Sequence, residues 1–122
     1  MTARDEVVAA LQTVVPSGIE VIAYSRDIDQ PAKPTVMVRV DRVRPVPESR
    51  EVRRYGFALI LITPKTTAGP ADDELDGLLE DVLHAVESST DGLVWTQATR
   101  ANYEDRFPAY QIELDVITQK EQ

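Results

Sequence analysis

The segment 51–63 is an extended run that is apolar on both of its faces. One set of alternate positions contains Tyr55, Phe57, Leu59 and Leu61, and the other contains Gly56, Ala58, Ile60 and Ile62. Because successive side chains of a strand point to opposite faces, this strand needs cover on both sides of its sheet. Leaving Ile60 and Ile62 in water would cost about 3–5 kcal/mol, a large share of a small domain's stability. We therefore expect a neighbouring subunit on the second face. The alternative is that helices lie on both sides of the sheet.

The remaining patterns predict two helices and four further strands. Apolar residues recur at helical spacing over 3–15 and over 70–88. Alternation or β-branched runs predict strands at 19–24, 36–41, 93–103 and 110–116. Pro45 and Pro47 are expected to end the second strand, and a turn is expected at 105–108. The order α-β-β-β-α-β-β predicts a single α+β domain over 1–122. Its sheet is mainly antiparallel with four to five strands, and both amphipathic helices lie on one face.

The residue types that usually carry chemistry are scarce. The chain has no cysteine, which excludes disulfides, thiolate metal sites and cysteine nucleophiles. Its one histidine, His84, falls on the solvated side of the second predicted helix. The carboxylates of 72–81 lack the spacing of a calcium loop, and no serine has a nucleophile motif around it. We therefore predict no catalytic residue, no metal ligand and no cofactor, and a protein that is not an enzyme.

Charge is unevenly distributed along the chain. The formal net charge is -8, yet the segment 39–54 holds six arginines against three carboxylates. These arginines flank a Pro-Val-Pro-Glu-Ser turn and predict a cationic hairpin. Three interpretations stay open: a solvated hairpin, a docking surface for an acidic protein, and a nucleic-acid site. The overall charge repels polyanions, and only Tyr55 supplies a neighbouring stacking ring, so nucleic acid is the weakest of the three. The predicted subunit interface contains Arg42, Arg44, Arg50, Arg53, Arg54, Ile60 and Ile62.

The opening residues and the lengths of the apolar runs indicate where the protein is made. No apolar run approaches the roughly 20 residues that cross a bilayer. The opening MTARDEVV has an acidic pair where a secretion signal carries basic and apolar regions. We expect synthesis in a cytoplasm and no membrane partner.

Taken together, these segments resemble the tail terminator proteins of long-tailed, non-contractile bacteriophages. The resemblance covers nearly the whole chain and is carried by the order and spacing of its segments. They are the helix DEVVAALQTVVP, the strands TVMVRVDRV and RYGFALILIT, the acidic helix DDELDGLLEDVLHAVESS, and the closing pair LVWTQATRANYED and AYQIELDVITQ. Related neck and tail-completion proteins share much of this pattern, and a cytosolic α+β ligand-binding or regulatory domain is the alternative from another class.

The resemblance implies a structural role in the virion, at the head-proximal end of the tail. Subunits of this family close into a ring, usually of six, that caps the growing tail tube and joins it to the head connector. The implied partners are further copies of the chain, the tail tube protein and the connector protein. DNA passes through the ring without specific binding. An acidic lining of the central hole would suit that passage, because it repels the DNA backbone.

Overall fold

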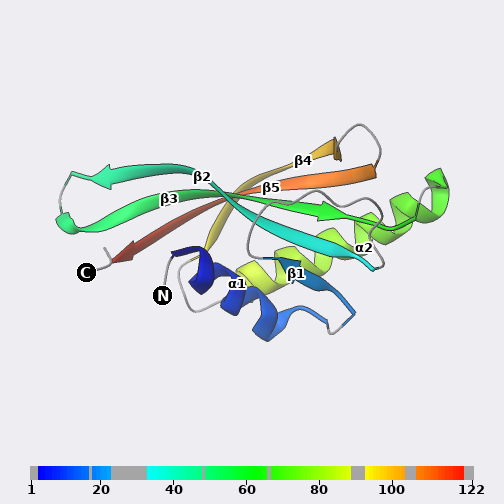
Figure 1. The fold of residues 1–122 in the computed structure, drawn as a ribbon, viewed down its shortest axis with the longest axis horizontal. Coiled ribbons are helices and arrows are strands. Elements are labelled where there is room, and N and C mark those ends of the chain that lie inside the picture. Colours follow the sequence, from blue (N-terminus) through cyan, green and yellow to red (C-terminus); the bar gives the residue numbers. More distant parts are fainter. Residues whose placement is uncertain are drawn as a thin grey trace.

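The computed structural model describes residues 3–16, 18–22, 33–47, 49–65, 67–88, 93–103 and 107–119. In chain order the elements are α1 (Ala3–Val14), β1 (Glu20–Ile22), β2 (Thr35–Val46), β3 (Ser49–Ile62), α2 (Ala68–Ser88), β4 (Val94–Tyr103) and β5 (Phe107–Gln119). The strands form one sheet in the order β1-β2-β3-β5-β4, in which only the short β1 pairs parallel to its neighbour. Both helices cover the same face of this sheet (Figure 1). The predicted α+β fold and element order are confirmed.

The main core lies between the two helices and the sheet. On the sheet side, alternate residues of the three long central strands are buried, with Leu59 at the centre and fully enclosed. On the helix side, Val7 and Leu11 of α1 meet Leu75 and Val82 of α2, all at most 1% exposed. Each of these side chains contributes roughly 1.5–3 kcal/mol by leaving water, which fixes the helices on this face. We call the other side of the sheet the open face.

The open face corrects the first expectation drawn from the sequence. Ile62 is fully buried and Ile60 is only 8% exposed within the single chain. They belong to a second small core with Ile22, Met37 and Phe107. The expectation that Ile60 and Ile62 need a neighbouring subunit is therefore wrong. The alternative with helices on both sides is also wrong, because Ile22 of the edge strand and Phe107 at the start of β5 join this core without a helix.

Register shifts at three places in the sheet change which way side chains point, and one of them, between Pro45 and Val46, lies next to the hairpin turn. The β2–β3 register shifts between Val40 and Arg42, and the β4–β5 register shifts between Trp95 and Gln97. An extra residue in a strand reverses the facing of everything beyond it. Arg42 therefore moves to the open face, although strict alternation from Val40 would have placed it on the helix side.

Pro47 follows the last residue of β2, as predicted, whereas Pro45 and Pro108 lie inside strands. Residues 105 and 106 of the predicted turn lie outside the described residues. Strand β2 continues through Pro45, and β5 already includes Pro108. Pro45 pairs with Arg53 on one side only, because β1 covers β2 only as far as Met37. Pro108 lies beyond the end of β3 and pairs only with β4. Each proline therefore stands where the strand has one free edge, which is where strands tolerate proline.

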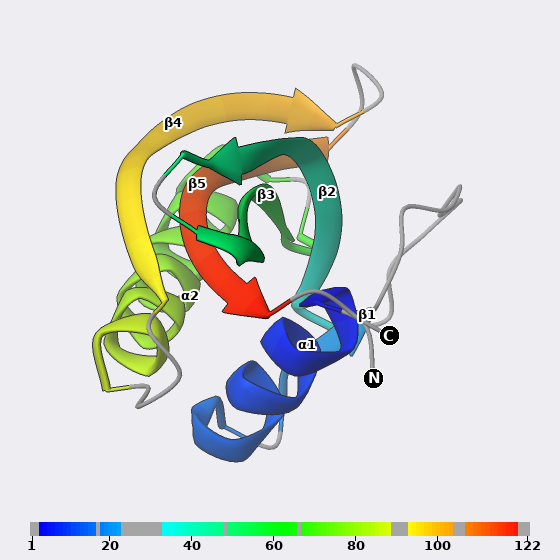
Figure 2. The same ribbon diagram turned by 90° about the vertical axis from the view of Figure 1, so that its left-hand side faces the viewer.

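The sheet is strongly twisted, and its β2–β3 hairpin extends past the helices at one end (Figure 1). Figure 2, seen from that end, shows β4 and β2 curving around β5 and β3 with both helices to one side. Val43, on the helix-side face of the hairpin, is 52% exposed, which confirms that no helix reaches it. Neither helix of the described residues has the length and apolar character to cross a lipid bilayer.

Candidate interaction site

Three arginines share the open face where the hairpin leaves the body of the protein. Arg42 stands opposite Gly56, and Arg44 stands directly opposite Arg54 on the neighbouring strand. All three arginines are exposed. Opposed residues on paired strands have Cβ atoms about 4.5–5.5 Å apart, so the side chains of Arg44 and Arg54 leave the sheet next to each other.

Gly56 leaves room for one of these arginines. A Cβ atom at this position would lie 3.3 Å from Nε and 3.5 Å from Cβ of Arg42. The Arg42 side chain therefore lies across the β3 backbone instead of extending straight into solvent. The next residue in this row of the sheet is Asp115 of β5, which pairs with Gly56.

The arginines of the hairpin differ in whether they have an acidic partner. Arg39, nearer the body of the sheet, lies 3.6 Å from Asp41. Among the residues that the structure describes, Arg42, Arg44 and Arg54 form no ion pair and no hydrogen bond. Like charges that face each other on paired strands destabilise a sheet. Within the described residues, these three cations therefore have no ion pair that would stabilise the monomer.

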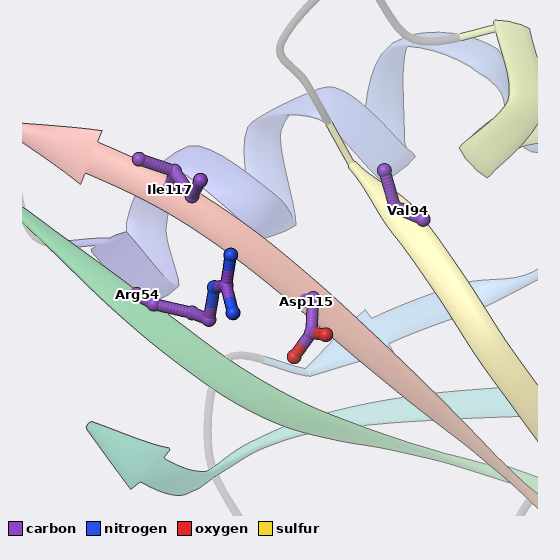
Figure 3. Close-up of a pocket in the computed structure, with 4 residues that line it drawn as sticks. All are labelled: Arg54, Val94, Asp115 and Ile117. Atoms are coloured by element: carbon purple, nitrogen blue, oxygen red, sulfur yellow. The ribbon is translucent and has the colours of Figure 1, made fainter. Parts of the chain in front are cut away.

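Beside the arginines, the open face has a hollow of about 410 Å³ lined by Arg54, Val94, Asp115 and Ile117. In Figure 3 the Arg54 side chain extends from β3 toward β5, between Ile117 and Asp115. Val94 and Ile117 are 58% and 50% exposed, two of the most exposed large apolar side chains described. We call Arg42, Arg44, Arg54, Val94 and Ile117 together the arginine face. Cations beside wet apolar groups are typical of a surface that another molecule covers.

The structure brings together only part of the predicted interface. Arg42, Arg44 and Arg54 lie on one surface, but Arg53 points to the helix-side face and is half-buried. The side chain of Arg50 lies outside the described residues. Ile60 and Ile62 are buried in the second core, as described above, and present no surface to a partner.

Sequence reasoning missed the apolar part of this site. Ile117 and Val94 are absent from the predicted interface. A signal for Ile117 was present in the sequence, because it follows Gln111, Glu113 and Asp115 at the polar positions of an alternating strand. An apolar residue at the end of such a polar series marks an exposed apolar side chain.

At the far end of the sheet, the charged groups are paired. Arg100 of β4 donates a 2.7 Å hydrogen bond to Asp72 of α2, and its guanidinium lies 5.6 Å from the ring centre of Tyr110. The hydrogen bond to Asp72 is the main reason that the pKa of Arg100 is raised above its ordinary value. Partial desolvation opposes this effect and lowers the pKa. Glu74 of α2 accepts a hydrogen bond from the Thr63 hydroxyl and lies 3.2 Å from the Lys65 ammonium. These contacts fasten the start of α2 to the sheet.

The outer side of α2 is strongly acidic. The helix carries seven carboxylates and no lysine or arginine. Four of the seven are exposed and have no ion pair or hydrogen bond within the described part of the chain. We call these four the acidic stripe: Asp73, Asp76, Glu80 and Asp81. They surround Gly77, a helix-interior glycine that costs about 0.5–1 kcal/mol relative to alanine.

His84 is exposed on α2, as predicted. Within the described ranges, no three histidine, cysteine, aspartate or glutamate residues lie together in a way that could hold a metal ion. No protein-family model and no curated protein matches the chain. The resemblance to phage tail terminators therefore stays a prediction based on the sequence pattern.

Proposed function

We propose that this chain is a structural assembly protein of a phage tail, and that it acts without catalysis. Copies associate head to tail into a ring that caps the tail tube, ends its growth and joins the tail to the head connector. Its partners are other copies, the tail tube protein and the connector protein, and its site of action is the virion. DNA passes through the ring without specific binding.

The observation that carries this proposal is the unpaired arginine face on an acidic protein. Arg44 and Arg54 face each other without a counter-ion, while the molecule as a whole has a formal net charge of -8. A surface of this kind gains most from contact with a carboxylate-rich protein surface, which relieves the arginine repulsion and covers Ile117. A second copy supplies such a surface. A contact between two different patches of identical chains closes into a ring when its rotation is right.

The net charge also fits passage of DNA. A chain with an excess of eight negative charges repels the phosphate backbone over most of its surface. The arginines are then buried between subunits and do not face the DNA. This arrangement gives a conduit that DNA does not adhere to.

The test compares two neighbouring arginines on opposite faces of one strand. Arg54→Glu should lower the association constant at least about tenfold, because it places a carboxylate where an acidic partner docks. Arg53→Glu makes the same charge change on the helix-side face and serves as the matched control. Sedimentation equilibrium at low salt measures both, and wild-type association should weaken as salt is added. Wild-type protein that stays monomeric at every concentration, even with tail tube protein present, would contradict the proposal.

The tail role has its own test. Purified chain added to polymerising tail tube protein should stop tube growth and appear as a ring at one tube end in electron micrographs. Tubes of unlimited length would count against a terminator. An effect only on the joining of heads to finished tails would instead support a neck or head–tail joining protein. Genes for tail tube and tape-measure proteins directly downstream would support the terminator.

The hollow beside Arg54 favours a second candidate function, the binding of an anionic small molecule in a cytosolic regulatory domain. Its volume of about 410 Å³ is within the range of small-molecule pockets. Thermal stabilisation by phosphorylated or carboxylated metabolites would support it, provided that Arg54→Gln abolishes the shift. The presence of Asp115 in the lining disfavours an anion, since a carboxylate repels it.

A further inference from the structure

We infer that the arginine face of one copy docks on the acidic stripe of α2 in a second copy. This inference rests on the proposed function and names the surface that receives the arginines. It commits to Asp73, Asp76, Glu80 and Asp81 as the receiving groups. Three features of the molecule support this pairing: the directions of the two surfaces, the spacing of their residues and the glycine at the centre of the stripe.

The two charged surfaces point away from each other in one molecule. The arginine face lies on the open side of the sheet, and α2 packs on the opposite side with its acidic stripe turned outward. Figure 1 shows the hairpin at one end of the long axis and the start of α2 near the other. A single chain therefore cannot bring the two surfaces together, whereas two chains placed front to back can. This is the geometry of a head-to-tail contact.

The backbone positions that carry the charged residues have similar spacing on the two surfaces. Arg42 and Arg44 are two residues apart on a strand, which is about 6.6 Å at the usual rise. Asp76 and Glu80 are four residues apart on a helix, which is about 6 Å. A helix lying along β2 can therefore present one carboxylate to each arginine. Arg54, on the adjacent strand, then lies beside the same helix.

Gly77 gives independent support for a contact at this place. It lies inside α2, where glycine is unfavourable, and nothing in the chain lies within 4 Å of the position a Cβ atom would occupy. Packing inside the monomer therefore does not explain the missing side chain. On the inferred contact, Gly77 lets the arginine side chains of the neighbouring copy approach the helix closely.

A charge-swap experiment tests the pairing directly. Arg44→Glu with Arg54→Glu reverses the arginine face, and Asp76→Arg with Glu80→Arg reverses the acidic stripe. Each double variant should lose self-association, because two of the charges on one surface then repel the surface that they meet. The chain that carries all four substitutions keeps the net charge of -8 and should associate again. An equal mixture of the two double variants should associate as well. Circular dichroism and thermal melting check that each variant folds.

The outcomes separate this inference from the proposed function. If reversing the arginine face blocks association but reversing the stripe does not, another surface receives the arginines and the inference is overturned, while the proposed function stands. Loss of association in both double variants without recovery in the combined variant also overturns the pairing. If reversing the arginine face has no effect on association, both the inference and the basis of the proposed function fail.

A second measurement uses the two glycines of α2. Gly77→Ala and Gly69→Ala both add a methyl group where nothing lies within 4 Å. Both variants should fold with an unchanged or higher melting temperature. Only Gly77→Ala should weaken association, by several-fold, because only Gly77 lies within the stripe. Equal association constants for the two variants would exclude Gly77 from the contact.

Discussion

The two ends of the sheet differ in how their side chains find partners. At the end that carries Ile62, Thr63 and Arg100, which we call the closed end, both faces of the sheet are buried and the charges are paired. At the hairpin end, Arg44 and Arg54 oppose each other without counter-ions, and Ile117 is half exposed. The same strands, β3 and β5, run through both ends.

This difference separates residues that stabilise the monomer from residues available to another molecule. Hydrogen-bonded carboxylates at the closed end hold α2 against the sheet. At the hairpin end, within the described residues, Arg42, Arg44 and Arg54 have no comparable contact, although the chain has an excess of carboxylates. An acidic protein that leaves arginines unpaired gains free energy when an acidic surface meets them. We therefore expect substitutions at the closed end to change folding, and substitutions at the hairpin end to change association.

The largest expected difference is between two isoleucines on the open face. Ile62→Ala should destabilise the monomer by about 2–5 kcal/mol, because Ile62 is fully buried and its removal leaves a cavity. Ile117→Ala, at the half-exposed position, should change stability by less than about 0.5 kcal/mol. Urea denaturation of dilute, monomeric protein measures both. Similar losses at the two positions would remove the distinction between the ends of the sheet.

Much of the fold follows from the sequence because periodicity reports burial directly. The alternation around Leu59 and the helical spacing of Leu75 and Val82 each match a buried face. Ile60 and Ile62 were also correctly identified as residues that need cover. What covers them was not predictable, because Ile22 and Phe107 come from segments that are distant in the sequence and join them only in the folded chain.

The candidate site was less predictable for a specific physical reason. The bulge after Val40 turns Arg42 to the open face, and a bulge leaves no clear sign in a strand's sequence. The cluster of arginines in the sequence correctly indicated a cationic hairpin. The arginines are divided between the two faces of the hairpin, with Arg53 and Arg54 on opposite faces. This division depends on the register of the paired strands. The hollow depends on β3, β4 and β5 lying side by side, which no local pattern specifies.

A smaller effect is expected from a buried hydroxyl group at the closed end. Thr63 is fully buried, donates a hydrogen bond to Glu74 and accepts one from the Lys65 backbone N–H at 3.1 Å. Thr63→Val should therefore cost about 1–2 kcal/mol. Thr96→Val, at the exposed bulge of β4 with one long 3.4 Å hydrogen bond, should stay within about 0.5 kcal/mol and is the control. Thermal melts that shift equally for both variants would argue against a specific role for the Thr63 hydroxyl.

The ion pair at the closed end should contribute less again. Arg100→Gln and Asp72→Asn should each cost about 0.2–1 kcal/mol, since both side chains are about half exposed. The double variant should lose little more than either single variant. Because the pKa of Arg100 is raised, the contribution of its charged form is lost as pH rises through that pKa. Because the Arg100–Asp72 pair is exposed, added salt should reduce its contribution to stability. A change from neutral to mildly alkaline pH should leave that contribution unchanged.

The smallest expected effect, with the opposite sign, is at the hairpin end. Arg44→Gln removes one member of the like-charged pair with Arg54 and breaks no ion pair or hydrogen bond in the described residues. At low salt the dilute monomer should be unchanged or stabilised by a few tenths of a kcal/mol, and added salt should cancel any gain. Arg100→Gln, the same substitution on the same sheet, should destabilise under the same conditions. Arg44→Gln should also weaken self-association, so stability and assembly should move in opposite directions. A loss of monomer stability as large as that of Arg100→Gln would mean that Arg44 supports its own sheet, and the arginine face would then need no partner to account for it.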